Sequence, residues 1–308
     1  MAKAENLVFS HLSDASAAEW LGDGLVVVAD DEINTLCVYR IPQAGAPVAS
    51  CDLTPWMNLN PKSPEMDLEG SAKIGDTIYW IGSHAANKEG KPRPNRKRFF
   101  ATRVTLSEGR PTFQLVGGAV NTLMSDLARD ARYAAFDLAA ASLAPPKTPG
   151  GLNIEALCDT PEGGLFIGFR APNPKGQALL APLKNPGDVV TGHPPTFGDP
   201  VLLDLGGNGV RSMLRTGDHY LIMSGSALSG GTFRLYRWDG QAAPQHVALP
   251  GLPHNANPEA MAVVDSDGKP ALLVISDDGT ELVEGQPAKQ LTDLSRRTFR
   301  GFLFPFVP

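Results

Sequence analysis

Ionisable residues recur at one position of a repeated sequence pattern, and this position is the one most suited to chemistry. Each copy has a polar leading residue, a short strand, a turn and a strongly apolar second strand; the copy with the earliest leading residue is shortened. The copies occupy residues 19–31, 69–84, 155–170, 211–226 and 259–278. The corresponding leading residues are Glu19, Glu69, Glu155, Arg211 and Glu259.

Carboxylates brought together in this way need a counter-charge, because an apolar core does not accept unpaired charges. Arg211 supplies one positive charge, and a divalent cation with oxygen ligands would supply the rest. Another oxygen donor stands two positions before three of the glutamates, as Asp67, Asn153 and Asn257. We therefore predict a divalent cation site, most suited to Ca²⁺, with the ligands Glu19, Asp67, Glu69, Asn153, Glu155, Asn257 and Glu259. In the alternative interpretation, these carboxylates cap turns and accept bonds from backbone amides.

A second set of polar residues ends the apolar strand of each copy, and its composition varies as an asymmetric ligand requires. Its members are Asp30, Asp31, His84, Arg170, Ser226, Asp277 and Asp278. His84 has the chemistry of a proton carrier or metal ligand near pH 7, and Arg170 that of a clamp for a carboxylate or phosphate. We predict His84, Glu155 and Arg170 as catalytic residues. The predicted substrate-binding residues are Arg211, Arg170, Asp31, Ser226 and Asp278.

The spacing of the copies predicts the architecture that must position these residues. The leading positions are 50, 86, 56 and 48 residues apart, close to the ~40–50 residues of a four-stranded propeller blade. This predicts an all-β propeller of five blades, or of six if residues 99–120 form a unit of their own. The long interval contains a predicted helical insertion near residues 121–144. Its apolar positions at helical spacing are Leu123, Leu127, Ala131, Ala134 and Leu138.

The whole chain, residues 1–308, is predicted to form this one domain. The strand-like ends, residues 6–10 and 298–304, are expected to pair and close the ring, which protects sheet edges. The composition of 32 Gly and 27 Pro in 308 residues suits many short strands joined by tight turns. With 42% hydrophobic residues, a large core is expected.

Composition also excludes several classes of protein. A net charge of −6 makes general nucleic-acid binding an unsuitable function, because that binding depends on neutralising phosphates. No stretch reaches the ~18 apolar residues of a membrane span, and the N-terminus has no signal-peptide core, so a cytoplasmic protein is expected. The three cysteines have no paired spacing and predict neither disulfides nor a zinc site. One basic segment, residues 87–98, is either a solvated hairpin or a cover over the channel that attracts anions.

Several motifs resemble a known family, the bacterial propeller domain DUF3616. They are Asp67-Leu-Glu-Gly70, Ile81-Gly-Ser-His84, Asn87-Lys, Arg93-Pro-Asn-Arg96, Asn153-Ile-Glu155 and Ile167-Gly-Phe-Arg170. The resemblance extends from about residue 15 to the end and implies a propeller with no assigned activity. More distantly, the triplets are similar to those of esterase-like phytase and lactonase propellers, which implies metal-dependent hydrolysis. Arg211, Ala156 and Ala260 depart from that pattern.

Two functions fit these residues. The first is metal-dependent hydrolysis of a small anionic substrate, a phosphoester or lactone, in the central funnel. The second is a propeller without catalysis that binds an anionic metabolite or peptide through the same Glu, Arg and His residues. A weaker third hypothesis is an interaction module that uses the helical insertion.

Overall fold

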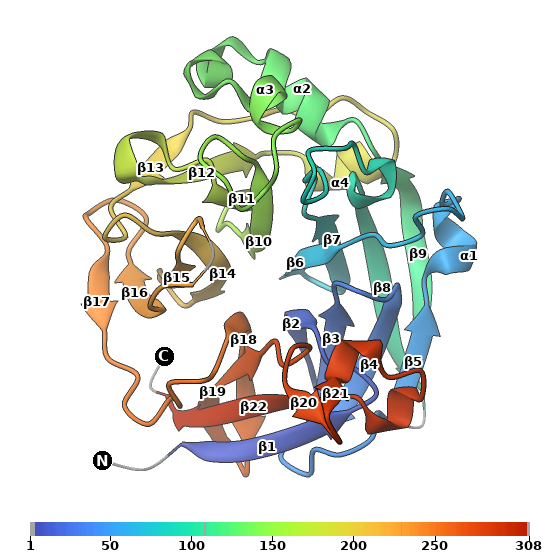
Figure 1. Ribbon diagram of the computed structural model, residues 1–308. Helices are drawn as coiled ribbons and strands as arrows, with labels where there is room; N and C mark the ends of the chain where they lie inside the picture. Colours follow the sequence, from blue (N-terminus) through green and yellow to red (C-terminus); the bar gives the residue numbers. More distant parts are fainter. Residues whose placement is uncertain (1–3, 108, 229, 307–308) are drawn as a thin grey trace.

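The computed structural model describes residues 4–107, 109–228 and 230–306. These residues form five four-stranded antiparallel sheets around a central axis (Figure 1). The arrangement confirms the predicted all-β propeller with five blades. Among the described residues, no helix has both the length and the apolar character needed to cross a membrane.

Each blade is a sheet whose first strand lies nearest the axis in Figure 1. The first blade contains β2 (Ala15–Gly22), β3 (Leu25–Asp30), β4 (Thr35–Arg40) and β5 (Ala49–Asp52). The second contains β6 (Leu68–Ile74), β7 (Thr77–Gly82), β8 (Phe99–Ser107) and β9 (Arg110–Val120). The third contains β10 (Asn153–Asp159), β11 (Leu165–Ala171), β12 (Ala178–Leu183) and β13 (Val201–Leu203). The fourth contains β14 (Gly209–Thr216), β15 (His219–Gly225), β16 (Arg234–Trp238) and β17 (Gln245–Val247). The fifth contains β18 (Pro258–Ser266), β19 (Lys269–Ser276), β22 (Thr298–Pro305) and β1 (Glu5–Ser10).

Strands β8 and β9 are the outer strands of the second blade. Strand β8 pairs with β7 on one side and with β9 on the other. The alternative in which residues 99–120 add a sixth blade is therefore wrong.

The two ends of the chain meet in the fifth blade. Strand β1 pairs antiparallel with β22 from Glu5↔Leu303 to Ser10↔Thr298. The Phe9 ring stacks on Phe299 with centroids 4.9 Å apart. The outermost strand of this blade thus comes from the opposite end of the sequence, which protects the edge of β22.

The core consists of five apolar clusters, one between each pair of neighbouring blades. Alternation along a strand sends successive side chains to opposite faces, so Val26 packs towards the fifth blade and Val27 towards the second. Gly70 allows a close approach at the axis, since a Cβ there would lie 2.8 Å from the backbone carbon of Ala156.

The helical insertion is present but broken into three pieces. They are α2 (Leu123–Arg129), the 3₁₀ turn η2 (Ala131–Phe136) and α3 (Leu138–Ala141). Asp130 ends the first piece, and its side chain accepts a bond from the backbone N–H of Arg132 at 3.0 Å. The break changes the buried face, so Tyr133 is buried while Ala131 and Ala134 are exposed. The predicted continuous apolar stripe is wrong at those two alanines.

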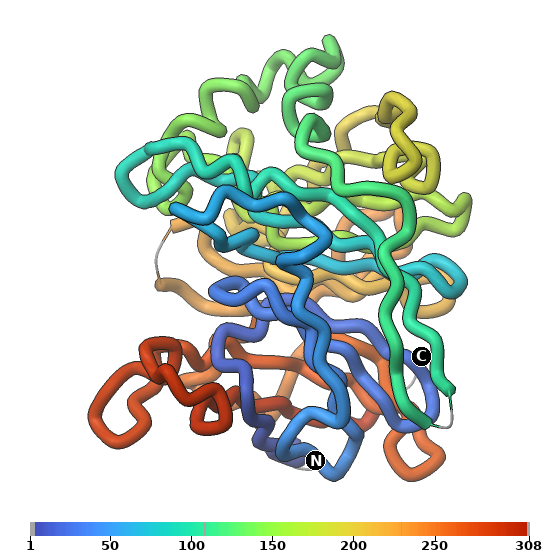
Figure 2. Tube along the Cα trace, turned by 90° about the vertical axis from the view of Figure 1, so that its right-hand side faces the viewer, coloured from blue at the N-terminus to red at the C-terminus, as the bar shows by residue number. Residues whose placement is uncertain are grey.

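The remaining elements are short. Four lie in the segment between β19 and β22, which extends on the same side of the propeller as the loop after β7 (Figure 2). They are the strands β20 (Leu282–Val283) and β21 (Gln286–Pro287), followed by the turns η4 (Ala288–Gln290) and η5 (Leu294–Arg296). Elsewhere are α1 (Thr54–Met57), η1 (Pro94–Arg96), η3 (Pro174–Gly176) and α4 (Pro186–Val190).

Candidate cation site at the mouth of the central channel

A β-bulge near the start of every innermost strand creates the ring of residues at the axis. Each bulge appears as a register shift between the first and second strands of its blade. The bulged residues are Ser16, Glu69, Glu155, Arg211 and Glu259. Four of these five are the predicted leading residues.

The placement of Glu19 in this ring is wrong. Glu19 pairs with Val27, three residues beyond the bulge at Ser16. It lines a separate 280 Å³ cavity within the channel, with Lys73 and Asp159, and burial raises its pKa to about 7. Strand pairing fixes the register of the first copy and makes Ser16 its leading residue. Residues 16–31 then have the same length as the copy at residues 69–84, so the first copy is not shortened.

The second predicted set also divides by register. In each blade, the residue directly after the bulge pairs with a residue of the second strand. Asp31, Arg170 and Asp277 each lie two residues beyond that partner in the chain, so they occupy equivalent positions. His84, Ser226 and Asp278 each stand one residue later. Neighbouring residues of a strand end face different directions, so the set does not form one ring.

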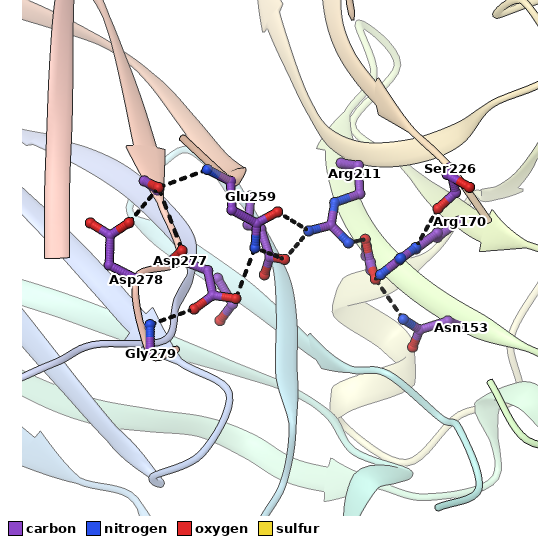
Figure 3. A network of polar contacts seen from close by, with 12 residues as sticks. Asn153, Arg170, Arg211, Ser226, Glu259, Asp277, Asp278 and Gly279 are labelled. Atoms are coloured by element: carbon purple, nitrogen blue, oxygen red, sulfur yellow. Dashed lines mark hydrogen bonds and ion pairs between the residues drawn. The ribbon is translucent and has the colours of Figure 1, made fainter. Parts of the chain in front are cut away.

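One half of the ring is an ion-pair network with its charges balanced (Figure 3). Glu155 accepts from Arg170 at 2.8 Å and pairs with Arg211 at 2.9 Å. Arg211 also pairs with Glu259, on the neighbouring blade. These side chains are buried, and two carboxylates face two guanidinium groups.

The amides of the predicted triplets take part in the same network. Asn153 donates to Glu155 at 2.6 Å, and Asn257 donates to Glu259 at 3.2 Å and to Asp277 at 2.9 Å. The other two guanidinium nitrogens of Arg170, Nε and Nη2, donate to the backbone oxygens of Ser226 and Leu228, at 2.8 and 2.9 Å. Four predicted cation ligands, Asn153, Glu155, Asn257 and Glu259, thus already have protein partners.

The other half of the ring holds more carboxylates than cations. Oxygen atoms of Asp31, Asp67 and Glu69 all lie within 4.8 Å of one another. Glu69 is only 7% exposed, and no described residue forms a hydrogen bond or ion pair with it. Asp31 Oδ1 is buried and has no hydrogen-bond partner among the described residues. We call these three residues the acidic triad.

Within the described part of the chain, one guanidinium group forms an ion pair with the acidic triad. Arg96 Nη1 lies 2.9 Å from Asp67 and its Nη2 lies 2.5 Å from Glu65. Asp67 also accepts a hydrogen bond from the Ser83 hydroxyl. Burial, followed by repulsion from neighbouring carboxylates, raises the pKa of both Asp31 and Glu69 well above the usual range. A bound cation would remove this repulsion.

A cavity of 510 Å³, the mouth pocket, opens beside the acidic triad. All three triad residues line it, together with the carboxylates Glu32, Glu65 and Glu89 and several cationic side chains. The cationic residues lining it are Lys88, Arg93, Arg96, Lys147 and Lys289. The pocket therefore combines ligands for a metal ion with charges that attract an anion.

The basic segment 87–98 is held by its own hydrogen bonds. Asn87 Oδ1 accepts from the backbone N–H groups of Glu89 and Lys91, at 3.0 and 2.8 Å. Arg98 is buried and donates to the Pro94 carbonyl at 3.0 Å. Arg96 and Arg98 thus point inward, while residues such as Lys88 remain at the pocket rim.

His84 and Asp278 are two of the predicted site residues that do not line the mouth pocket. His84 is fully buried, with both ring nitrogens unpartnered among the described residues. Its burial, with the charges of Lys97 and Arg98, lowers its pKa to about 3, so it is neutral at pH 7. Asp278 pairs with Arg300 on β22 at 2.6 Å. Neither residue lines the pocket.

The sequence reasoning missed Asp14 and Lys289, which border the acidic triad. Asp14 stands two residues before the bulge at Ser16, as Asp67 stands before Glu69. Aligning the first copy by its bulge would have identified Asp14. Lys289 follows β21, outside the repeats, and no sequence signal marks it.

Comparison with known proteins identifies a family and a fold. Residues 14–108 and 97–289 match the family described as a protein of unknown function, DUF3616. No curated protein matches the chain in sequence. The Malassezia sympodialis allergen Mala s 1 is similar in structure, with 9% identity over 99% of this chain and 96% of that one, and a TM-score of 0.56.

Two enzymes are also similar in overall structure. The putative oxidoreductase (glucose dehydrogenase) of Thermus thermophilus has 14% identity over 98% of this chain and 100% of that one, with a TM-score of 0.47. The glutaminyl cyclase of Myxococcus xanthus has 12% identity over 99% and 97%, also with a TM-score of 0.47. At such low identity, none of these structures indicates an activity for this chain.

Proposed function

We propose that this chain, which belongs to the DUF3616 family of proteins of unknown function, binds one divalent cation at the acidic triad and hydrolyses a small anionic substrate in the mouth pocket. The observation that carries this proposal is the unpartnered carboxylate of Glu69, 7% exposed, beside Asp31 and Asp67. A buried charge is retained only when it is paired or binds a metal.

The donor set suits a cation that prefers oxygen. Three carboxylates provide charged oxygen ligands, and the open pocket leaves room for water and substrate oxygens, as Ca²⁺ requires with its six to eight ligands. When bound, such a cation lowers the pKa of a water molecule and polarises an ester or phosphoryl oxygen. The cation ligands we propose are Asp31, Asp67 and Glu69, in place of the larger set expected from the sequence.

Protein side chains would hold the substrate by its charge. Arg93 and Lys147 line the pocket wall and would bind a phosphate or carboxylate group, Arg93 with the option of two parallel bonds. Arg96, which is already bound to Asp67, would keep that carboxylate in place. This favours a phosphoester, or a lactone that carries an acidic group.

A second candidate function is binding of an anionic ligand without catalysis. The observation in its favour is that the predicted catalytic residues are not free to act on a substrate. Glu155 and Arg170 pair with each other, and His84 is buried and does not line the pocket. Cation-dependent ligand binding with no turnover would support this candidate over hydrolysis.

The test compares Glu69→Gln with Glu19→Gln, a channel carboxylate outside the acidic triad. Isothermal titration with Ca²⁺, Mg²⁺ and Mn²⁺ should give one site in the wild type and in Glu19→Gln, and none in Glu69→Gln. Phosphomonoester, phosphodiester and lactone substrates should be hydrolysed only with the cation, and not by Glu69→Gln. Absence of cation binding by the wild type would overturn the proposal.

A further inference from the structure

A second group of carboxylates adjoins the acidic triad and shares one of its members. Oxygen atoms of Asp14, Asp31 and Glu32 also lie within 4.8 Å of one another. Asp14 is buried, at 3% exposed, whereas Glu32 is exposed. Asp31 therefore stands between two sets of oxygen ligands, as a carboxylate does when it bridges two cations.

The ammonium group of Lys289 occupies this second set. Its Nζ lies 2.6 Å from Glu32 Oε1 and 3.8 Å from Asp14 Oδ1. The backbone N–H of Lys289 donates to the Gly279 carbonyl at 3.0 Å, which fixes the start of the side chain. Burial lowers the pKa of Lys289, but Glu32, Asp14 and Asp31 together raise it above its usual value, so the group is charged.

The two sets thus differ in what neutralises them. In the acidic triad, Arg96 pairs with Asp67 but Glu69 has no hydrogen-bond or ion-pair partner among the described residues, while Asp14 and Glu32 have an ammonium between them. Carboxylates this close repel one another unless a counter-charge or a proton neutralises them. The asymmetry indicates a centre with one position for an exchangeable cation and one position already filled.

We propose that Lys289 is a built-in cation that fills the second position of a two-cation centre, with Asp31 between the two positions. The proposal rests on the cation site at the acidic triad proposed above. It predicts that the chain binds a single divalent cation because the ammonium group excludes a second. Removing that group would create a site of hard oxygen ligands for another ion such as Ca²⁺ or Mn²⁺.

The Lys289 side chain also lines the mouth pocket. A fixed positive charge beside the exchangeable cation would bind an anionic oxygen of the ligand, as the second metal ion does in two-metal sites. Lys289 would therefore both take the place of a second cation and position the substrate.

The experiment counts bound cations in the full chain. Titration calorimetry and equilibrium dialysis with Mn²⁺ and Ca²⁺ should give one equivalent for the wild type and two for Lys289→Met and Lys289→Gln. Lys289→Arg should restore one, because it keeps the charge. Lys147→Met, an exposed lysine of the same pocket, is the matched control and should bind one. Asp14→Asn added to Lys289→Met should return the count to one.

The possible counts separate the two proposals. One equivalent in both the wild type and the Lys289 variants overturns the built-in cation and leaves the acidic triad site standing. Two equivalents in the wild type also overturn it. No binding by the wild type overturns the proposed function; in that case one equivalent in Lys289→Met supports the role of Lys289, and none overturns both.

Discussion

Replacing Glu69 by Gln should stabilise the protein without metal and abolish its stabilisation by metal. The three triad carboxylates lie within 4.8 Å of one another. At that separation, each pair of full charges repels by about 3.5 kcal/mol at an effective dielectric constant of about 20. The substitution removes two of the three pairs. Partial protonation already relieves much of this repulsion, so we expect a gain of about 1–2 kcal/mol, or roughly 1.5–3 °C in Tm for a chain of 308 residues.

The pH dependence gives the sign of this effect. Burial and like charges raise the pKa of Glu69, so the folded state binds more protons than the unfolded state above the ordinary pKa of glutamate. Stability without metal therefore falls as the pH rises through this range. The advantage of Glu69→Gln should be larger at pH 7.5 than at pH 4.5.

Adding cation should reverse the order of the two proteins. At a concentration of 100 times Kd, a ligand that binds only the folded state stabilises it by about 2.7 kcal/mol. Differential scanning calorimetry with EDTA, and then with excess Ca²⁺ or Mn²⁺, measures both effects, with Glu19→Gln as the control that keeps the cation response. A Glu69→Gln protein less stable than the wild type in EDTA, with neither protein responding to cations, would refute this reasoning.

Three further predictions concern the residues around the site. Arg211→Met leaves Glu155 and Glu259 without a shared buried partner and should cost about 3–5 kcal/mol in urea unfolding; equal losses for Arg129→Met, at an exposed pair, would contradict this. The pKa of His84 is lowered to about 3 in the folded state, so the unfolded state binds a proton first as the pH falls below ~6.5. The free energy of unfolding of the wild type should therefore fall by about 2 kcal/mol more than that of His84→Leu between pH 7.5 and pH 5. Parallel pH profiles would show that His84 is not buried in the neutral form. Gly279→Ala places a Cβ 1.8 Å from Asp14 Oδ1 and should cost about 1–3 kcal/mol, whereas Gly118→Ala, which faces open space, should be neutral in the same thermal melts.

The fold was accessible from the sequence because each blade repeats the same local physics. Alternating or continuous apolar residues around a tight turn, as in Leu25–Asp30 and Leu165–Ala171, specify two paired strands wherever they occur. The predicted helical insertion is interrupted at Asp130 and at Asp137, where capping side chains accept bonds from the backbone N–H groups of Arg132 and Ala140. Local hydrogen bonding there outweighed the periodicity.

The site was only partly accessible. Asp67 and Glu69 were expected as cation ligands, and Asp31 was expected in the substrate-binding set. Glu155 and Glu259 had the same sequence pattern as Glu69 but are paired with arginines in the structure. The sequence could not separate these cases, since all of them occupy bulges at equivalent positions.

The sequence alone determined the repeated strands and four of the five residues of the ring, because these follow from interactions between residues close together in the chain. It left five or six blades open, and strand pairing in the structure decided for five. Tertiary structure decided which charges neutralise one another. Arg211 meets Glu259 across 48 positions and Lys289 meets Glu32 across 257, and such pairings depend on distances set by the packing of separate blades. Electrostatic energy varies with those distances and with burial, so the unpaired carboxylate of Glu69 became visible only once the ring had closed.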